Sequence, residues 1–144
     1  MKKHTIIWED NAFTVYFFGE ITLKDLFAAN NELTSNSRLD STTHYYFDFC
    51  NVSQLNLSKR DLQVYAKYDS VMPRFIRRSR MRGAFRVASS AMREVWNEFL
   101  EQGHQAWPRK VFCSSIIAET WVQDVGCIHE HFEMNRMQYK SATA

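Results

Sequence analysis

The sequence predicts an α/β fold: a single domain with a five-stranded mixed sheet, an N-terminal antiparallel hairpin and about four helices. After residue 20, short apolar strands alternate with longer segments of helical periodicity, a pattern typical of parallel strands joined by right-handed crossovers. Before residue 20, two strand-like runs are joined by only a few polar residues, which favours a hairpin. With 144 residues, 45% of them hydrophobic, the chain can bury one core without disulfides.

The hairpin comprises residues 5–8 and 12–19, with a polar turn at residues 9–11. Side chains alternate along a strand, so odd and even positions of the second run face opposite sides of the sheet. We expect Phe13, Val15 and Phe17 to lie on one side of the sheet. Thr14, Tyr16 and Phe18 are then expected on the opposite side.

The first helix begins at Thr22, because a threonine followed three residues later by Asp25 is a capping pattern. Leu23, Leu26 and Leu33 then recur at helical spacing and predict one buried stripe. A polar loop at 36–41 ends the helix.

The aromatic stretch 44–50 is the next strand, and a polar loop leads from it to Ser58. Together with Asp61, Ser58 repeats the capping pattern and starts the second helix. This helix ends near Pro73, since proline lacks the backbone donor and clashes with the preceding turn.

Residues 81–88 alternate with a period of two and predict a fourth strand. Ser89-Ser90 opens a strongly amphipathic third helix, which Gly103 terminates. A short strand at 109–113 and a helix starting at Ser114 or Ser115 complete a domain over residues 1–125. Residues 126–144 are expected to form a surface extension, partly helical or loose.

Composition points to a cytoplasmic protein without a membrane span. Three cysteines at no disulfide or metal spacing favour a reducing compartment, and there is neither an export signal nor an apolar run of about 18 residues. The net charge of +2 implies no polyanionic partner for the whole molecule. Six arginines do cluster locally, but few aromatic residues are interleaved with them, so a nucleic-acid partner is disfavoured: Arg74, Arg77, Arg78, Arg80, Arg82 and Arg86.

Several short motifs resemble the STAS-type fold of anti-sigma-factor antagonists, and more closely the bacterial SpoIIAA-like group. They comprise Phe18-Gly19-Glu20-Ile21-Thr22, Phe47-Asp48-Phe49 with Ser58 and Asp61, Val87-Ala88-Ser89, and Val111-Phe112 with Ala118 and Trp121. The resemblance covers roughly residues 5–125. It implies a regulatory protein that docks a protein partner and whose switch serine, within an Asp-Ser-Ser-Gly motif, is phosphorylated. The corresponding stretch here is Asn56-Leu57-Ser58-Lys59, which matches at Ser58 alone.

The first candidate site is the rim at the carboxyl ends of the parallel strands, where open α/β sheets bind ligands. We expect a regulatory or partner-binding set there: Ser53, Asn56, Ser58, Lys59, Ser89, Ser90 and Ser114. A phosphate on Ser58 would meet backbone donors and the helix dipole. The alternative is that these serines are ordinary helix caps.

The second candidate site is the sheet face that the helices cover only partly. It carries tyrosines beside an acid and an arginine, which suits a dimer interface or a ligand pocket: Tyr16, Phe18, Tyr46, Asp48 and Arg86. The alternative is a structural ion pair between Asp48 and Arg86.

No catalytic constellation, cofactor motif or metal site is predicted. His129 and His131 lie two apart and would point to opposite sides of a helix, away from a common ligand site with Cys127 and Glu133. The sequence therefore favours a non-enzymatic protein-interaction module that uses the serine-lined rim. The alternative is a protein that binds or senses a small amphiphilic or anionic, lipid-like ligand, beneath the first helices or on the open sheet face.

Overall fold

The computed structural model describes residues 1–74, 76, 81–113 and 115–123. Its centre is one five-stranded sheet in the order β1-β2-β3-β4-β5. The first pair is antiparallel and the other three pairs are parallel, which confirms the predicted α/β class and the N-terminal hairpin. The strands are β1 (His4–Trp8), β2 (Ala12–Ile21), β3 (His44–Leu55), β4 (Arg82–Arg86) and β5 (Arg109–Phe112).

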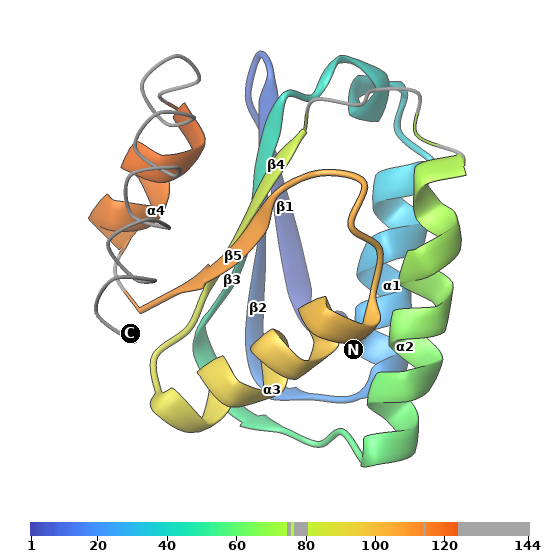
Figure 1. The fold of residues 1–144 in the computed structure, drawn as a ribbon, viewed down its shortest axis with the longest axis vertical. Helices are drawn as coiled ribbons and strands as arrows, with labels where there is room; N and C mark the ends of the chain where they lie inside the picture. The colour runs from blue at the N-terminus through green and yellow to red at the C-terminus, as the bar shows by residue number, and fades with distance from the viewer. Residues whose placement is uncertain (75, 77–80, 114, 124–144) are drawn as a thin grey trace, which may run out of the picture.

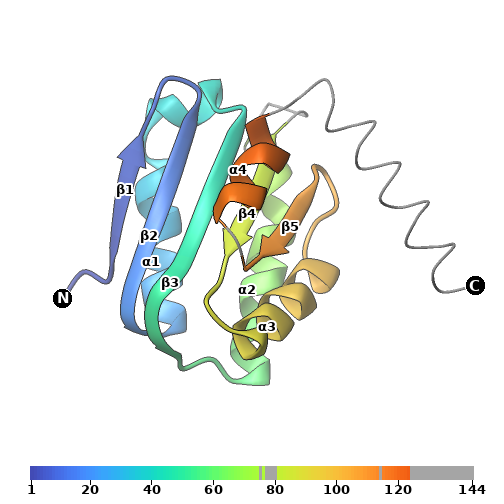
Figure 2. The ribbon, with the colours of Figure 1, turned by 90° about the vertical axis from the view of Figure 1, so that its left-hand side faces the viewer.

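Among the described residues, three α-helices pack on one face of the sheet and a fourth lies on the other (Figure 1). The first three are α1 (Leu23–Thr34), α2 (Lys59–Val71) and α3 (Ser90–Gln102). The fourth, α4 (Ser115–Gln123), covers β4 and its neighbours, while β1 and β2 lie bare on that side among the described residues (Figure 2). Two short 3-10 helices are η1 (Ser37–Ser41) and η2 (Met72–Arg74).

The core between the sheet and α1 to α3 is aromatic. Phe49 on β3 stacks on Phe17 of β2, with ring centroids 4.8 Å apart, and on Trp96 of α3 at 4.5 Å. Trp96 is fully buried. The expected alternation on β2 is confirmed, because Phe13, Val15 and Phe17 are buried whereas Tyr16 and Phe18 are exposed. This packing fixes which face of β2 meets the helices.

Strand β3 is longer than predicted: it runs to Leu55 rather than to Cys50. Its polar second half does not look like a strand in sequence, but the extended end of β2 pairs with it. The pairing shifts register on either side of Gly19, whose φ of +76° lies in the left-handed region that glycine tolerates. As a result Ser53 belongs to a strand and not to a loop.

Helix α3 ends at Gly103 as predicted, and Gly103 is not in the left-handed conformation. The φ of Gly103 is −79°, which any residue adopts. A Cβ at this position would lie 2.3 Å from the Oδ2 atom of Asp69, so a larger residue would have to displace the Asp69 carboxylate.

Candidate functional site

The carboxyl ends of β3 and β4 bring the starts of α2 and α3 to the same edge of the sheet, at the bottom of Figure 1. This edge is the predicted rim. Six of its seven predicted members are described, and all six are exposed: Ser53, Asn56, Ser58, Lys59, Ser89 and Ser90. Ser114 lies outside the described residues.

Ser58 is the N-cap of α2. Its Oγ accepts a hydrogen bond from the backbone N–H of Asp61 at 3.0 Å, and its own N–H donates to Asp61 Oδ2 at 3.0 Å. The hydroxyl is therefore engaged as an acceptor but stays at the surface. Lys59 follows directly and adds a positive charge at the positive end of the helix dipole.

The other rim residues have similarly local roles. Ser89 caps α3, its Oγ accepting from the N–H of Met92 at 3.2 Å. Asn56 donates its side-chain N–H to Glu20 Oε1 at 3.1 Å and so ties the α2 approach to the end of β2. Among the described residues no hydrogen bond joins one rim serine to another. The described members of the rim therefore form an exposed polar surface.

The second predicted set divides in two on the sheet face that α4 partly covers. Tyr16 and Phe18 are 37% and 40% exposed, whereas Tyr46, Asp48 and Arg86 are at most 7% exposed. The three buried residues do not lie on an open face as expected, because α4 packs over this part of the sheet (Figure 2).

Arg86 is held by a buried ion pair, its Nε lying 3.2 Å from Asp48 Oδ2. Its guanidinium lies 4.6 Å from the ring centre of Tyr46 and 5.9 Å from that of Tyr16. Asp48 also accepts the backbone N–H of Cys50 at 2.8 Å. Burial, followed by the nearby Asp48, raises the pKa of the Cys50 thiol to about 11, so this thiol stays protonated at neutral pH.

The arginine cluster does not form one surface. Arg86 is buried and Arg82 lies over the Trp121 ring at 5.9 Å, while Arg77, Arg78 and Arg80 fall outside the described residues. The residues considered as metal ligands near His129 also fall outside them. In the part of the chain that the structure describes, no group of three or more metal-ligating side chains occurs.

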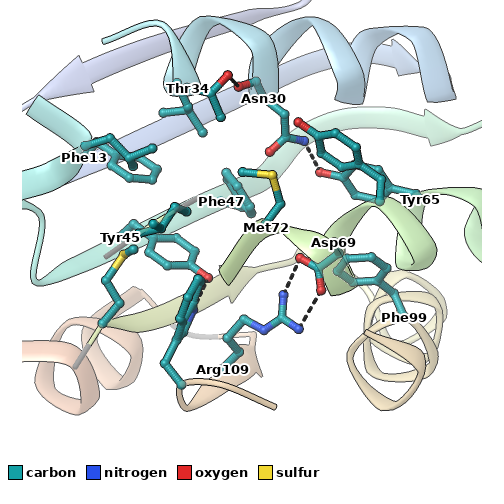
Figure 3. A pocket seen from close by; sticks show the side chains of 16 residues that line it. Phe13, Asn30, Thr34, Tyr45, Phe47, Tyr65, Asp69, Met72, Phe99 and Arg109 are labelled. Carbon is teal, nitrogen blue, oxygen red and sulfur yellow. Dashed lines mark hydrogen bonds and ion pairs between the residues drawn. The ribbon is translucent and has the colours of Figure 1, made fainter. Parts of the chain in front are cut away.

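A third feature is a cavity of about 50 Å³ between α1, α2 and the amino-terminal ends of the parallel strands (Figure 3). The residues that line it were not identified from the sequence. Its walls are mainly aromatic and aliphatic, from Phe13, Tyr45, Phe47, Tyr65, Met72 and Phe99. Asn30 enters from α1 and donates its amide N–H to the Tyr65 hydroxyl. Burial raises the pKa of Tyr65, so its hydroxyl remains neutral.

One charged pair faces this cavity. Arg109 on β5 donates two hydrogen bonds to the Asp69 carboxylate of α2, at 2.9 and 2.8 Å, and a third to the His104 carbonyl at 2.8 Å. Burial, and then the positive Arg109, lower the pKa of His104 to about 4. Beside them Trp107 donates to the Tyr45 hydroxyl at 2.9 Å. Tyr45 and Asp69 are distant in sequence from Trp107 and Arg109, so the sequence gave no signal that they share a site.

No family model matches the chain, and no curated protein matches it in sequence. Solved structures do match. The anti-sigma factor antagonist SpoIIAA in its unphosphorylated form is 10% identical with a TM-score of 0.52, covering 79% of this chain and 91% of that one.

Two further structures agree. An uncharacterized DUF3478-family protein with a SpoIIAA-like fold, from Shewanella loihica PV-4, is 14% identical with a TM-score of 0.54 and covers 83% of this chain and 91% of its own. An anti-sigma factor antagonist from Mycobacterium paratuberculosis is 15% identical with a TM-score of 0.52, covering 84% and 93%. The chain has a SpoIIAA-like fold.

The SpoIIAA-like fold confirms the STAS-like architecture that the sequence motifs suggested. At these identities the likeness establishes the fold and leaves partner, ligand and site open. The described helices include none long and apolar enough to cross a membrane.

Proposed function

We propose that this protein is a non-enzymatic interaction module that docks a regulatory protein partner through the rim formed by Ser53, Asn56, Ser58, Lys59, Ser89 and Ser90. The observation that carries the proposal is the exposure of all six side chains at one edge of the sheet. Solved anti-sigma factor antagonists share the fold, which supports a regulatory role for it.

The chemistry of the rim favours an acidic partner surface. The first backbone N–H groups of α2 and α3 point toward this edge, and the helix dipoles make it locally positive. Lys59 and Arg60 are exposed beside Ser58 and add two positive charges. A carboxylate or phosphate group on the partner would therefore be stabilised at the α2 start.

Site-specific photo-crosslinking in the organism of origin tests the location. A photoreactive residue replacing Lys59 or Ser90 is expected to capture the same protein partner. Replacing Asn36, which caps η1 beyond the end of α1, provides the control and is expected to capture none. Capture from position 36 with none from 59 or 90 would place the docking surface elsewhere.

Binding measurements on the captured partner test the role of Ser58. Loss of a serine cap costs about 1 kcal/mol, which can weaken binding by at most about fivefold if only the helix start is affected. On our proposal Ser58→Ala weakens binding well beyond that limit. Asn36→Ala removes a comparable cap, since the Asn36 side chain accepts from the Arg38 N–H at 2.9 Å, and is expected to leave affinity unchanged.

The cavity in Figure 3 favours a second candidate function, binding of a small apolar ligand beneath α1 and α2. The cavity has an aromatic wall typical of ligand sites. An uncharged ligand fits it better than an anionic one, because Arg109 is already neutralised by Asp69. At about 50 Å³ it is smaller than cavities of about 150 Å³ that admit benzene, so binding requires Met72 or another lining side chain to move.

Native mass spectrometry of protein purified from its host tests this second candidate. A retained small molecule would support it, and a stoichiometric protein partner would support the interaction module instead. Titration with benzene and with benzoate tests the charge argument. Benzene is expected to shift the NMR signals of Phe13, Tyr45 and Tyr65, whereas benzoate, which must compete with Asp69, is expected not to.

A further inference from the structure

The outer edge of β1 presents unpaired backbone groups at alternate residues. Lys3 accepts a hydrogen bond from Phe18 N–H at 3.1 Å, and Glu9 N–H donates to the Ala12 carbonyl at 2.8 Å. Lys3 and Phe18 continue the register of β1 and β2 by one residue at one end, and Glu9 and Ala12 continue it at the other. In an antiparallel ladder the bonded residues alternate, so the odd positions of β1 face β2. The N–H and C=O groups of His4, Ile6 and Trp8 therefore point away from the sheet.

Charge is distributed along this edge with opposite signs at its two ends. Lys2 and Lys3 precede the strand, and Glu9 and Asp10 follow it. Lys2 is also ion-paired with Glu32 of α1, and the same carboxylate contacts His4 within the strand. A two-fold axis at Ile6 would place Lys3 of one copy opposite Glu9 of the other, and Lys2 opposite Asp10. The same axis pairs His4 with Trp8 and Ile6 with itself, which are the residues whose backbone groups face outward. One register thus satisfies both the charges and the hydrogen bonds.

We propose that β1 pairs antiparallel with β1 of a second copy of this chain about an axis at Ile6, joining the two sheets into one. The three outward residues on each copy would form about six backbone hydrogen bonds. Lys3 and Glu9 would lie in pairs that are not hydrogen-bonded, where side chains on neighbouring strands approach most closely.

The side chains on the open face of the sheet agree with this arrangement. The axis pairs residues of the same parity, so the open face of one sheet continues as the open face of the other. On that face Ile7 is 47% exposed and Phe18 on the adjacent β2 is 40% exposed. Ile7 would lie opposite Thr5 of the second copy. The exposed members of the predicted dimer face, Tyr16 and Phe18, would then lie beside the new strand pair. The buried members, Tyr46, Asp48 and Arg86, would make no contact across it.

The β1 edge also lacks the devices that prevent such pairing. Edge strands are commonly protected by a proline, a bulge or a charge in the middle of the strand. β1 has none of these: its register with β2 is regular and its charges stand at the ends. The opposite edge differs, because β5 carries Arg109 and Lys110 with no acidic residue at its other end, so antiparallel self-pairing would not match charges.

A charge-reversal cycle tests the proposal. Sedimentation velocity at low salt is expected to detect a dimer of the full chain whose population rises with concentration. Lys3→Glu alone places a carboxylate against Glu9 of the second copy, and Glu9→Lys alone places two ammonium groups together, so each variant is expected to be monomeric. An equimolar mixture of the two variants restores oppositely charged pairs and is expected to form a heterodimer. The double variant Lys3→Glu/Glu9→Lys is expected to self-associate like the original chain.

Matched variants control for net charge. Lys24→Glu on α1 and Glu98→Lys on α3 make the same charge changes at exposed helix positions outside the proposed strand pair, and are expected to leave the dimer intact. A monomer at all concentrations would overturn the proposal. So would a dimer that persists in both single variants, which would place the interface on another surface.

Hydrogen exchange provides a second readout in the unmodified chain. The amides of Thr5 and Ile7 face β2 and are expected to be protected at every concentration. Those of His4, Ile6 and Trp8 are expected to gain protection only where the dimer is populated. Equal protection of the two sets at low and high concentration would rule out pairing through this edge.

Discussion

Asp69 of α2 and Arg109 of β5 form a two-hydrogen-bond ion pair that joins the helix layer to the end of the sheet. The Arg109 and Asp69 side chains are only 5% and 14% exposed. Arg109 also binds the His104 carbonyl, and Asp69 accepts the His104 N–H at 3.2 Å, so the pair fixes the turn between α3 and β5. Its position beside the cavity makes it the main polar anchor of that region (Figure 3).

Removing one member of this pair is expected to destabilise the fold strongly. Asp69→Ala leaves the Arg109 charge buried without a partner, a change that costs about 3 to 5 kcal/mol of unfolding free energy. Urea unfolding followed by circular dichroism measures the loss. The double variant Asp69→Leu/Arg109→Leu removes both charges and is expected to cost less than the sum of the single variants. Additive losses would show that the two charges are not coupled.

Gly103→Ala is expected to destabilise the protein by about 1 to 3 kcal/mol, because its methyl group would overlap the Asp69 carboxylate. Backbone strain plays no part, since φ is −79°. The same substitution in an Asp69→Ala background tests the cause. There the carboxylate is absent and the additional cost is expected to fall, leaving only the close approaches to Arg109 Nη2 at 3.0 Å and to the Phe99 carbonyl oxygen at 3.3 Å. An unchanged cost in that background would point to a different clash.

Stability is expected to fall as the pH drops below about 6.5. The pKa of His104 is lowered from 6.5 to about 4, so folding favours its neutral form. Its contribution is complete above pH 6.5 and is lost progressively between pH 6.5 and 4, amounting to at most about 3 kcal/mol in total. Unfolding curves at several pH values measure the slope. His104→Asn retains an acceptor for the Ala106 N–H but does not titrate, so its slope in this range is expected to be shallower.

Cys50 is expected to react slowly with iodoacetamide at pH 7 despite its exposure. Its pKa of about 11 leaves very little thiolate, and the rate is expected to rise about tenfold per pH unit up to that value. Mass spectrometry of the modified peptides measures the rate at Cys50 separately from other thiols. A rate that levels off near pH 8.5 would contradict the raised pKa.

Local patterns in the chain were sufficient for most of the architecture. Thr22 and Ser58, each with an acidic residue three positions later, located two helix starts, because a cap depends only on neighbours in sequence. The alternation of Phe13, Val15 and Phe17 identified the buried face of β2, since side-chain direction in a strand has a period of two. The antiparallel pairing of the N-terminal hairpin followed from the short connection between its strands, and the parallel pairing of the later strands followed from their alternation with helices.

Relationships between distant residues were decided by packing. Whether Arg86 is exposed depends on where α4 lies, and no local pattern specifies which face of the sheet a final helix covers. Asp69 and Arg109 line the cavity, and they meet each other and His104 only because α2 packs against the turn before β5. Local sequence determined the helices, strands and caps through short-range sterics and hydrogen bonds, and the burial of one surface against another decided which distant side chains share a site.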